Sequence, residues 1–184
     1  MKINEKGFII VNKYLETNIE GIFALGDAVG KYQFKHNANN EAQYAYNNII
    51  NPERKIPVDY AAMPHAIFSN PQIAGVGYTE QELKKNKIEY EKSVYPFIQT
   101  GMGQAIEDKD GFVKFLIDKK DRTILGCHII GTDASILIHE VLVAMRSGGR
   151  SVSNENEGKI DIIIKTIHIH PALSEVISRA ASKI

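Results

Sequence analysis

The chain has 184 residues, of which 43% are hydrophobic, enough to bury the core of one domain or of one domain and part of another. Its 22 basic and 22 acidic residues are interspersed, so a nucleic-acid partner is not expected. No apolar run has the length of a membrane span, so no membrane partner is expected either. A single cysteine, Cys127, excludes an internal disulfide framework and favours the cytoplasm.

The first 60 residues combine a short apolar run with an amphipathic helix. The run 22–25 ends in Gly26-Asp27 and is typical of a buried parallel strand that is apolar on both faces. Residues 37–50 predict a helix, because apolar residues recur there at helical spacing. These apolar residues are Ala38, Ala42, Ala45 and Ile49. The segment 51–57, with two prolines and several charges, indicates a linker.

A second unit, 61–184, contains a series of strand-like stretches. The last two flank a charged turn and predict a β-hairpin. The stretches are 65–69, 73–78, 89–98, 111–118 and 123–130. Because these strands are followed by helices, the pattern predicts an α+β domain with an antiparallel sheet.

Four helices are predicted in the same unit. Thr79 and Glu82 have the spacing of a capping box, which starts a helix that runs to about residue 86. Asp133 is placed to cap a second helix, and the glycines at 148–149 are placed to end it. The last two helices are expected at 160–167 and from Pro171 onward.

The first candidate for chemistry is Gly26-Asp27. The carboxyl ends of strands form the edge at which open α/β sheets bind their ligands. Asp27 can accept hydrogen bonds from sugar-like hydroxyls there, and Gly26 lets a ligand approach the backbone. The alternative is that Asp27 only caps a turn, and the residues alone leave both interpretations open.

The second candidate is the helix start at 35–39. A helix N-terminus offers free N–H groups and a partial positive charge, which can stabilise negative charge on a ligand. The alternative is that Asn37 is the N-cap of an ordinary surface helix.

The third candidate is His170, which precedes Pro171 at an expected helix start. Glu175 lies about one turn inside that helix and is placed to accept the Nδ1–H of His170, which would leave Nε2 free as a base. One alternative is a metal site formed by His168 and His170, although a third and fourth ligand at the usual spacing are missing. Another is a histidine that only caps a helix. Cys127 lies in an apolar strand and is expected to be a buried small hydrophobe.

In this order, the three motifs resemble the C-terminal portion of the pyridine nucleotide–disulfide oxidoreductase family, over nearly the whole chain. Residues 21–27 look like its second FAD motif. Residues 35–39 and 169–177 look most like the dihydrolipoamide dehydrogenase and mycothione reductase branches. Other matching segments are 70–77, 111–115 and 124–131.

The resemblance implies that the parent enzyme uses FAD and NAD(P)H to reduce a small-molecule or lipoyl disulfide. It implies an FAD-binding remnant of an α/β domain at 1–60 and a homodimer formed through the interface domain 61–184. The residues expected to contact FAD are Gly26, Asp27, Asn37 and Ala38.

The resemblance also implies that His170, oriented by Glu175, acts as an acid/base across the dimer. The sequence has no Gly-x-Gly-x-x-Gly motif and no Cys-x4-Cys pair. We therefore expect this chain by itself to be inactive and to bind no FAD.

A rival hypothesis is a free-standing dimerisation or interaction module without redox activity, and the reading frame upstream of Met1 would discriminate. A third hypothesis is a small metal-binding protein that uses His168 and His170. The sequence does not identify the disulfide substrate, and it does not choose between NADH and NADPH. The polar segment 147–159 is longer than the resemblance leads us to expect, and it has no assigned role.

Overall fold

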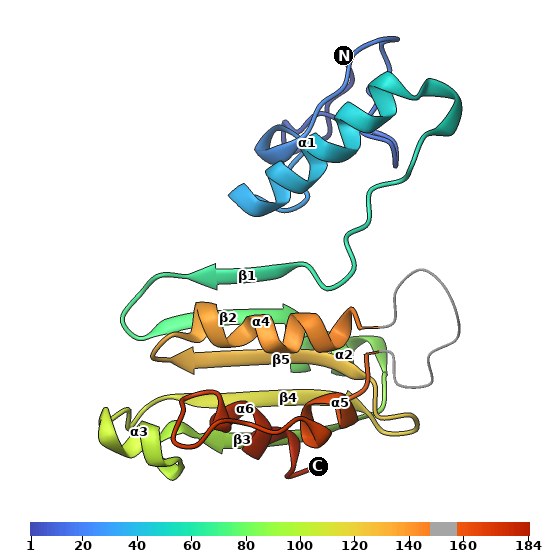
Figure 1. Ribbon diagram of the computed structural model, residues 1–184. Helices are drawn as coiled ribbons and strands as arrows, with labels where there is room; N and C mark the ends of the chain where they lie inside the picture. The colour runs from blue at the N-terminus through green and yellow to red at the C-terminus, as the bar shows by residue number, and fades with distance from the viewer. Residues whose placement is uncertain (148–157) are drawn as a thin grey trace. The chain divides into compact units, whose positions relative to one another are not determined.

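The computed structural model describes residues 1–147 and 158–184, which form two compact units, Met1–Ala61 and Ala62–Ile184 (Figure 1). The predicted helix end at Gly148-Gly149 and most of the segment 147–159 lie outside the described residues. In the two described ranges, no helix is both long enough and apolar enough to cross a bilayer.

The first unit is built around α1, Lys35–Ile50, which begins two residues earlier than predicted and lies between the 3-10 helices Gly26–Ala28 and Pro52–Arg54. The buried parallel strand predicted at 22–25 is wrong. Phe23 forms only an isolated antiparallel bridge, and Ile22 is exposed. A buried strand needs neighbours on both edges to pair its backbone groups, and the run 22–25 forms a single bridge, between Phe23 and Glu16.

The buried side of α1 is largely polar, and of the apolar stripe predicted there only Ala45 is buried. Ala42 and Ile49 are exposed, whereas Asn37, Glu41 and Asn48 are buried. Each of the three buried side chains has hydrogen bonds to groups outside its own helix, which compensate for the loss of water.

The second unit contains a five-stranded antiparallel sheet in the order β1-β2-β5-β4-β3, which confirms the predicted α+β fold class. The predicted β4–β5 hairpin is confirmed, with Phe115 opposite Cys127. Because side chains alternate along a strand, Cys127 faces the core and His128 faces the opposite side of the sheet. The strands are β1 Pro64–Ile67, β2 Gln72–Gly77, β3 Tyr90–Pro96, β4 Phe112–Asp118 and β5 Ile124–Gly131.

Helices cover one face of this sheet (Figure 1). α4, Ala134–Met145, packs on β2 and β5, and α6, Glu175–Ala181, packs on β3 and β4. α5, Asp161–Lys165, contacts both of these helices. The core lies between the sheet and the helices, and it includes Val113, Phe115, Ile129, Ile138, Val141, Val176 and Ile177.

The remaining helices are short. The predicted capping box is confirmed at α2, Glu80–Asn86, where the Thr79 hydroxyl accepts the Glu82 N–H and the Glu82 carboxylate accepts the Thr79 N–H. α3 spans Gly101–Ala105, and a 3-10 helix at Phe97–Gln99 shortens the strand predicted over 89–98.

The helix predicted to start at Pro171 begins at Glu175 instead, with Ser174 as its N-cap. The N–H groups of Glu175 and Val176 bond to carbonyls three residues earlier, so the chain forms turns before it becomes helical. His170 is therefore not the cap of α6.

Two further helix ends differ from the predictions. The helix expected over 160–167 ends at Lys165, because Thr166 is extended and the chain after it brings His168 to α4. Asp133 is the N-cap of α4, but its side chain makes no capping bond. Its φ of 55° is left-handed, whereas side-chain capping favours extended backbone.

Candidate functional site

His170 and Glu175 lie together at the start of α6. Nδ1 of His170 lies 3.1 Å from both carboxylate oxygens of Glu175. The same carboxylate accepts the Ala172 N–H at 3.2 Å. The Glu175 side chain is 9% exposed and the His170 side chain 73% exposed, so a carboxylate held by the fold orients an accessible imidazole.

The charge of Glu175 determines which ring nitrogen of neutral His170 carries the proton. The hydrogen bond from His170 lowers the pKa of Glu175, burial opposes this effect, and the Ala172 N–H adds to it. Glu175 thus stabilises the fold above its unfolded pKa, and the contribution is lost as the pH falls through the lowered value. Because an ionised carboxylate only accepts, Nδ1 of neutral His170 carries the proton. Nε2 keeps its lone pair, with no hydrogen-bond partner in residues 1–147 and 158–184.

A second histidine–carboxylate pair, which the sequence did not predict, precedes the first by two residues. Nε2 of His168 lies 2.6 Å from Oε1 of Glu140, and Nδ1 lies 2.9 Å from the Thr166 carbonyl oxygen. The His168 side chain is 9% exposed. With both ring nitrogens engaged, His168 anchors the segment 166–170 to α4.

The hypothesis of a metal site at His168 and His170 gains no further ligands from the fold. Over the described ranges, no three His, Cys, Asp or Glu side chains are grouped so that they could hold a metal ion. Cys127 is buried in β5, and burial raises the pKa of its thiol, so it is a core residue as predicted.

In the first unit, a buried carboxylate ties Gly26 to the start of α1. Glu41 accepts the Gly26 N–H, the Asn37 side-chain amide at 3.1 Å and the Tyr60 hydroxyl at 2.7 Å. The Asn37 amide also donates to the Tyr32 carbonyl at 3.0 Å. Burial raises the pKa of Tyr60, and the carboxylate that accepts its hydroxyl raises it further.

The four predicted cofactor residues adjoin one another around this carboxylate. Gly26 has a φ of +65°, and a Cβ there would lie 3.2 Å from the Cβ of Ala38, so the turn packs closely on α1. Asn37 is buried and Asp27 is exposed. The structure therefore brings Gly26, Asn37 and Ala38 together, with the Asp27 side chain accessible beside them.

Two family patterns match the chain. The pyridine nucleotide-disulphide oxidoreductase dimerisation domain matches residues 63–181, and the pyridine nucleotide-disulphide oxidoreductase pattern matches residues 1–42. The chain belongs to the pyridine nucleotide-disulphide oxidoreductase family. The family predicted from the ordered motifs is thereby confirmed.

Relatives of this chain include two dihydrolipoyl dehydrogenases. The protein from Corynebacterium glutamicum is 35% identical over 183 residues, and the protein from Trypanosoma brucei brucei is 36% identical over 181 residues. Both alignments cover 98% of this chain, but only 37% and 36% of the respective relatives. The chain thus spans little more than a third of the length of these relatives.

Solved structures share the fold. The Cu(II) complex of the HOCl-induced flavoprotein disulfide reductase RclA from Escherichia coli has a TM-score of 0.85 at 23% identity, covering 100% of this chain and 40% of its own. LpdA from Mycobacterium tuberculosis has a TM-score of 0.84 at 21% identity, covering 99% of this chain and 38% of its own.

The side-chain oxygen of Asn37 shows whether the residues of the first unit fit the FAD that the family implies. Its Oδ1 is buried and has no hydrogen-bond partner in the part of the chain that the structure describes. Unpaired buried acceptors are rare in native proteins, and both hydrogens of this amide are already used. The residues therefore fit a ligand that brings an N–H or O–H donor, as a flavin does.

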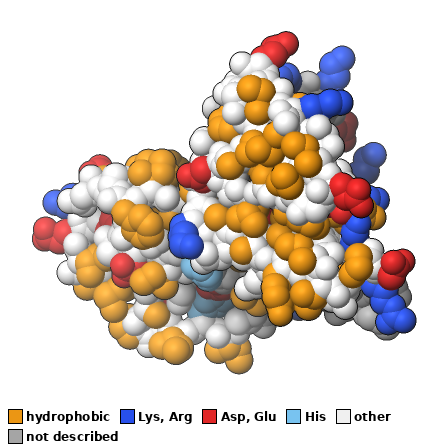
Figure 2. Space-filling model, turned by 90° about the horizontal axis from the view of Figure 1, so that it is seen from above, with side chains coloured by type: hydrophobic (Ala, Val, Ile, Leu, Met, Phe, Trp, Pro, Cys, Tyr) orange, Lys and Arg blue, Asp and Glu red, His pale blue; other side chains and the backbone are white. Residues whose placement is uncertain are grey.

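Apolar surface surrounds the His168–Glu140 pair. A hollow of about 530 Å³ is lined by α4, α5 and the segment 166–169. Ile136, Val143, Ile167 and Ile169 are exposed large hydrophobic residues of the same elements. Hydrophobic side chains also form exposed patches in the view of Figure 2. Contiguous apolar surface is typical of an association site.

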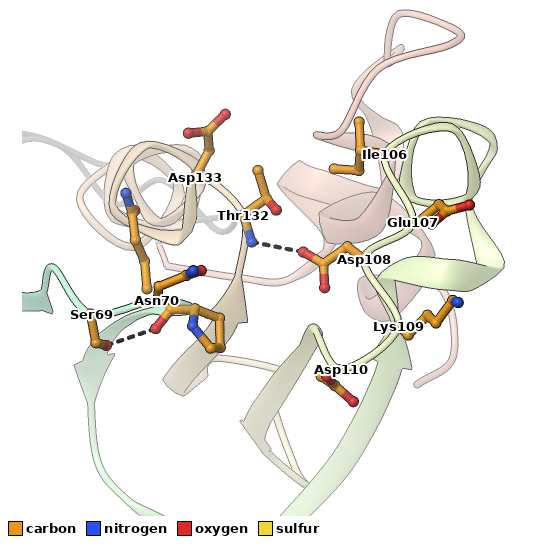
Figure 3. A pocket seen from close by; sticks show the side chains of 11 residues that line it. Ser69, Asn70, Ile106, Glu107, Asp108, Lys109, Asp110, Thr132 and Asp133 are labelled. Carbon is orange, nitrogen blue, oxygen red and sulfur yellow. Dashed lines mark hydrogen bonds between the residues drawn. The ribbon is translucent and has the colours of Figure 1, made fainter.

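A different hollow, of about 580 Å³, is lined by residues 69–72, 106–110 and 132–133 (Figure 3). Asp108 projects from its wall, and the two oxygens of this carboxylate accept the N–H groups of Gly111 and Thr132, each at 2.8 Å. Asp108 thus ties two loops together, and no residue of either candidate site lines this hollow.

Sequence reasoning missed Glu41, Tyr60 and Glu140. A signal for Glu41 existed, because it shares a helical face with Asn37 and Ala45, at intervals of four residues. Glu140 gave no such signal, since its partner His168 is 28 residues away in the sequence.

The proton positions of His170 predict an NMR signature. In the 184-residue chain, the neutral ring of His170 should be the Nδ1–H tautomer, because Glu175 accepts there. His128 should be the Nε2–H tautomer in the same spectrum, because its Nε2 lies 2.9 Å from the Tyr78 carbonyl oxygen. Long-range ¹H–¹⁵N correlation of the ring nitrogens distinguishes the two.

Glu175→Gln is the matched variant, and it should reduce the Nδ1–H population of His170 while leaving His128 unchanged. Finding the same Nε2–H pattern for both histidines in the unmodified chain would show that the His170–Glu175 hydrogen bond does not form.

Proposed function

We propose that this chain is the C-terminal dimerisation portion of an FAD-dependent NAD(P)H:disulfide oxidoreductase of the dihydrolipoamide dehydrogenase type. In this proposal, residues 1–60 belong to its FAD-binding domain and residues 61–184 form its interface domain. His170 and Glu175 are the acid/base pair. The observation that carries the proposal is the accessible imidazole oriented by a buried carboxylate, with Nδ1 at 3.1 Å and Nε2 left free.

The bound FAD would supply electron transfer between NAD(P)H and a disulfide. The contribution of this chain is proton transfer. Nε2 of His170 takes the proton of a thiol, and the resulting thiolate attacks one sulfur of a disulfide. A new S–S bond forms as the old one breaks, and His170 returns the proton to the sulfur that departs as a thiolate. Glu175 accepts the Nδ1–H throughout, and its negative charge stabilises the imidazolium that forms.

The reacting sulfur atoms come from outside this chain. Its single cysteine, Cys127, is buried in β5. His170 lies instead on a surface where Ile167 is 96% exposed and Ile169 is 77% exposed. Burial of these isoleucines against a second subunit would bring His170 to the partner's redox centre, so the proposal includes a homodimer.

Residues at the start of α1 would hold the cofactor. Asp27 offers an exposed carboxylate for the ribityl hydroxyls, and Asn37 offers the unpaired Oδ1. Gly26 packs closely against Ala38, which holds the Asp27 turn beside the start of α1.

Replacement of His170 tests its catalytic role in the complete reductase. General acid/base catalysis typically contributes about 10²–10⁴-fold, so His170→Ala should lower turnover of the disulfide by about that factor. Glu175→Ala should cause a smaller loss, because Glu175 only orients and polarises the imidazole. Steady-state turnover and stopped-flow reduction of the flavin absorption by NAD(P)H separate the two half-reactions, and only disulfide turnover should fall.

His128→Asn is the matched control, because His128 lies on the sheet face opposite α4 and α6 and should leave turnover nearly unchanged. If His170→Ala has normal turnover and a lowered melting temperature, His170 has a structural role and not a catalytic one. Loss of the flavin-reduction step alone would also refute the assignment.

A second prediction concerns the 184-residue chain as purified, which should be colourless. Asp27 and Asn37 provide one wall of a cofactor site, and the sequence contains no glycine-rich pyrophosphate loop, so most of the binding free energy is missing. The absorption spectrum checks this directly. A stoichiometric flavin band would contradict the proposed division of the FAD site.

A further inference from the structure

Glu41 is the buried charge at the centre of the first unit. We infer that Glu41 is a positioning residue of the cofactor site, which holds the Gly26-Asp27 turn and the Asn37 amide in the arrangement that receives the cofactor. The inference deepens the proposed function and rests on it, because the ligand is the FAD of the same protein.

The Glu41 carboxylate joins parts of the chain that are distant in sequence. It accepts hydrogen bonds from Gly26, 15 residues earlier, from Asn37 on its own helix, and from Tyr60, 19 residues later. A buried carboxylate is costly unless several donors surround it. Here three donors surround the carboxylate. They reach it only when the Gly26 turn, helix α1 and Tyr60 are correctly positioned relative to one another.

Glu41 also decides which atom of the Asn37 amide is available. The two hydrogens of the amide go to the Tyr32 carbonyl oxygen and to Oε1 of Glu41. A flipped amide would set its oxygen against these two acceptors, so the observed orientation is the favoured one. Oδ1 is therefore left as an unpaired buried acceptor. A ligand that occupies this position must present an N–H or O–H group to it.

The same carboxylate fixes Asp27. Glu41 accepts the N–H of Gly26, the residue directly before Asp27. Gly26 has a φ of +65° in this turn. Loss of that bond frees the turn to rotate about Gly26. The exposed Asp27 carboxylate would then lose its fixed direction relative to Asn37.

The test compares Glu41→Gln with Asn48→Ala in the complete reductase. Asn48 is a buried side chain on the same face of α1, and it bonds to Tyr14 and Ile56 rather than to the Gly26 turn. If Glu41 has a purely structural role, both variants should lower the melting temperature, and neither should weaken FAD binding more than this loss of stability explains. The positioning role predicts a split between them.

In FAD titrations of the apoprotein followed by flavin fluorescence, Glu41→Gln should raise the dissociation constant about 10- to 100-fold, the range for a lost hydrogen bond to a charged group. Asn48→Ala should bind FAD like the unmodified protein. Amide hydrogen exchange in the 184-residue chain gives a readout without cofactor. The Gly26 N–H should exchange faster in Glu41→Gln and at the unmodified rate in Asn48→Ala.

The outcomes separate the two levels of the proposal. Failure of the unmodified complete protein to bind FAD overturns the proposed function. Tight FAD binding by Glu41→Gln, with unchanged Gly26 exchange, overturns only the inference. If Glu41→Gln does not fold, Tyr60→Phe decides, because it removes one donor and keeps the carboxylate. A weakened FAD complex with faster Gly26 exchange then supports the inference, and unmodified behaviour overturns it.

Discussion

Burial of one sheet face under α4 and α6 is the interaction on which the rest of the second unit depends. Val176 and Ile177 of α6 are fully buried, and burial of such a side chain contributes about 1.5–3 kcal/mol. Ser93 of β3 donates to the Ala180 carbonyl at 2.7 Å, which fixes α6 along its axis. The position of α6 in turn fixes Glu175, and Glu175 fixes the ring of His170. The geometry proposed for proton transfer is thus a consequence of core packing, which holds a carboxylate more rigidly than a surface loop could.

Carboxylates that are buried or half-buried recur as organising groups in both units. Glu175 holds His170, Glu140 holds His168, and Glu41 holds the Gly26 turn. In each case the carboxylate sits on an α-helix and its partner lies outside the α-helices, with His168 and His170 in irregular chain and Gly26 in a 3-10 helix. Hydrogen bonds to a charged acceptor are about twice as strong as neutral ones. Helices therefore position the irregular segments that carry the candidate chemistry.

The sequence predicted those features that depend on local spacing. The capping box at Thr79 and the β4–β5 hairpin follow from residues a few positions apart, and the structure contains both. The helix start expected at Pro171 and the strand expected at 22–25 were wrong. A short sequence pattern does not encode the turn hydrogen bonds that precede Glu175. It also does not encode whether residues 22–25 have neighbouring strands with which to pair. The buried polar face of α1 was missed for the same reason, because only distant donors make the burial of Glu41 favourable.

Dimerisation of this chain follows from the proposed function, and α4 gives its physical basis. One side of α4 packs on the sheet through Ile138 and Val141, while Ile136 is 66% exposed and Val143 is 71% exposed on the other. Size-exclusion chromatography with multi-angle light scattering of the purified chain at micromolar concentration tests the claim most directly. A homodimer has a mass of twice the 20.5 kDa of one chain, and this is the expected result. A single species of 20.5 kDa would contradict it.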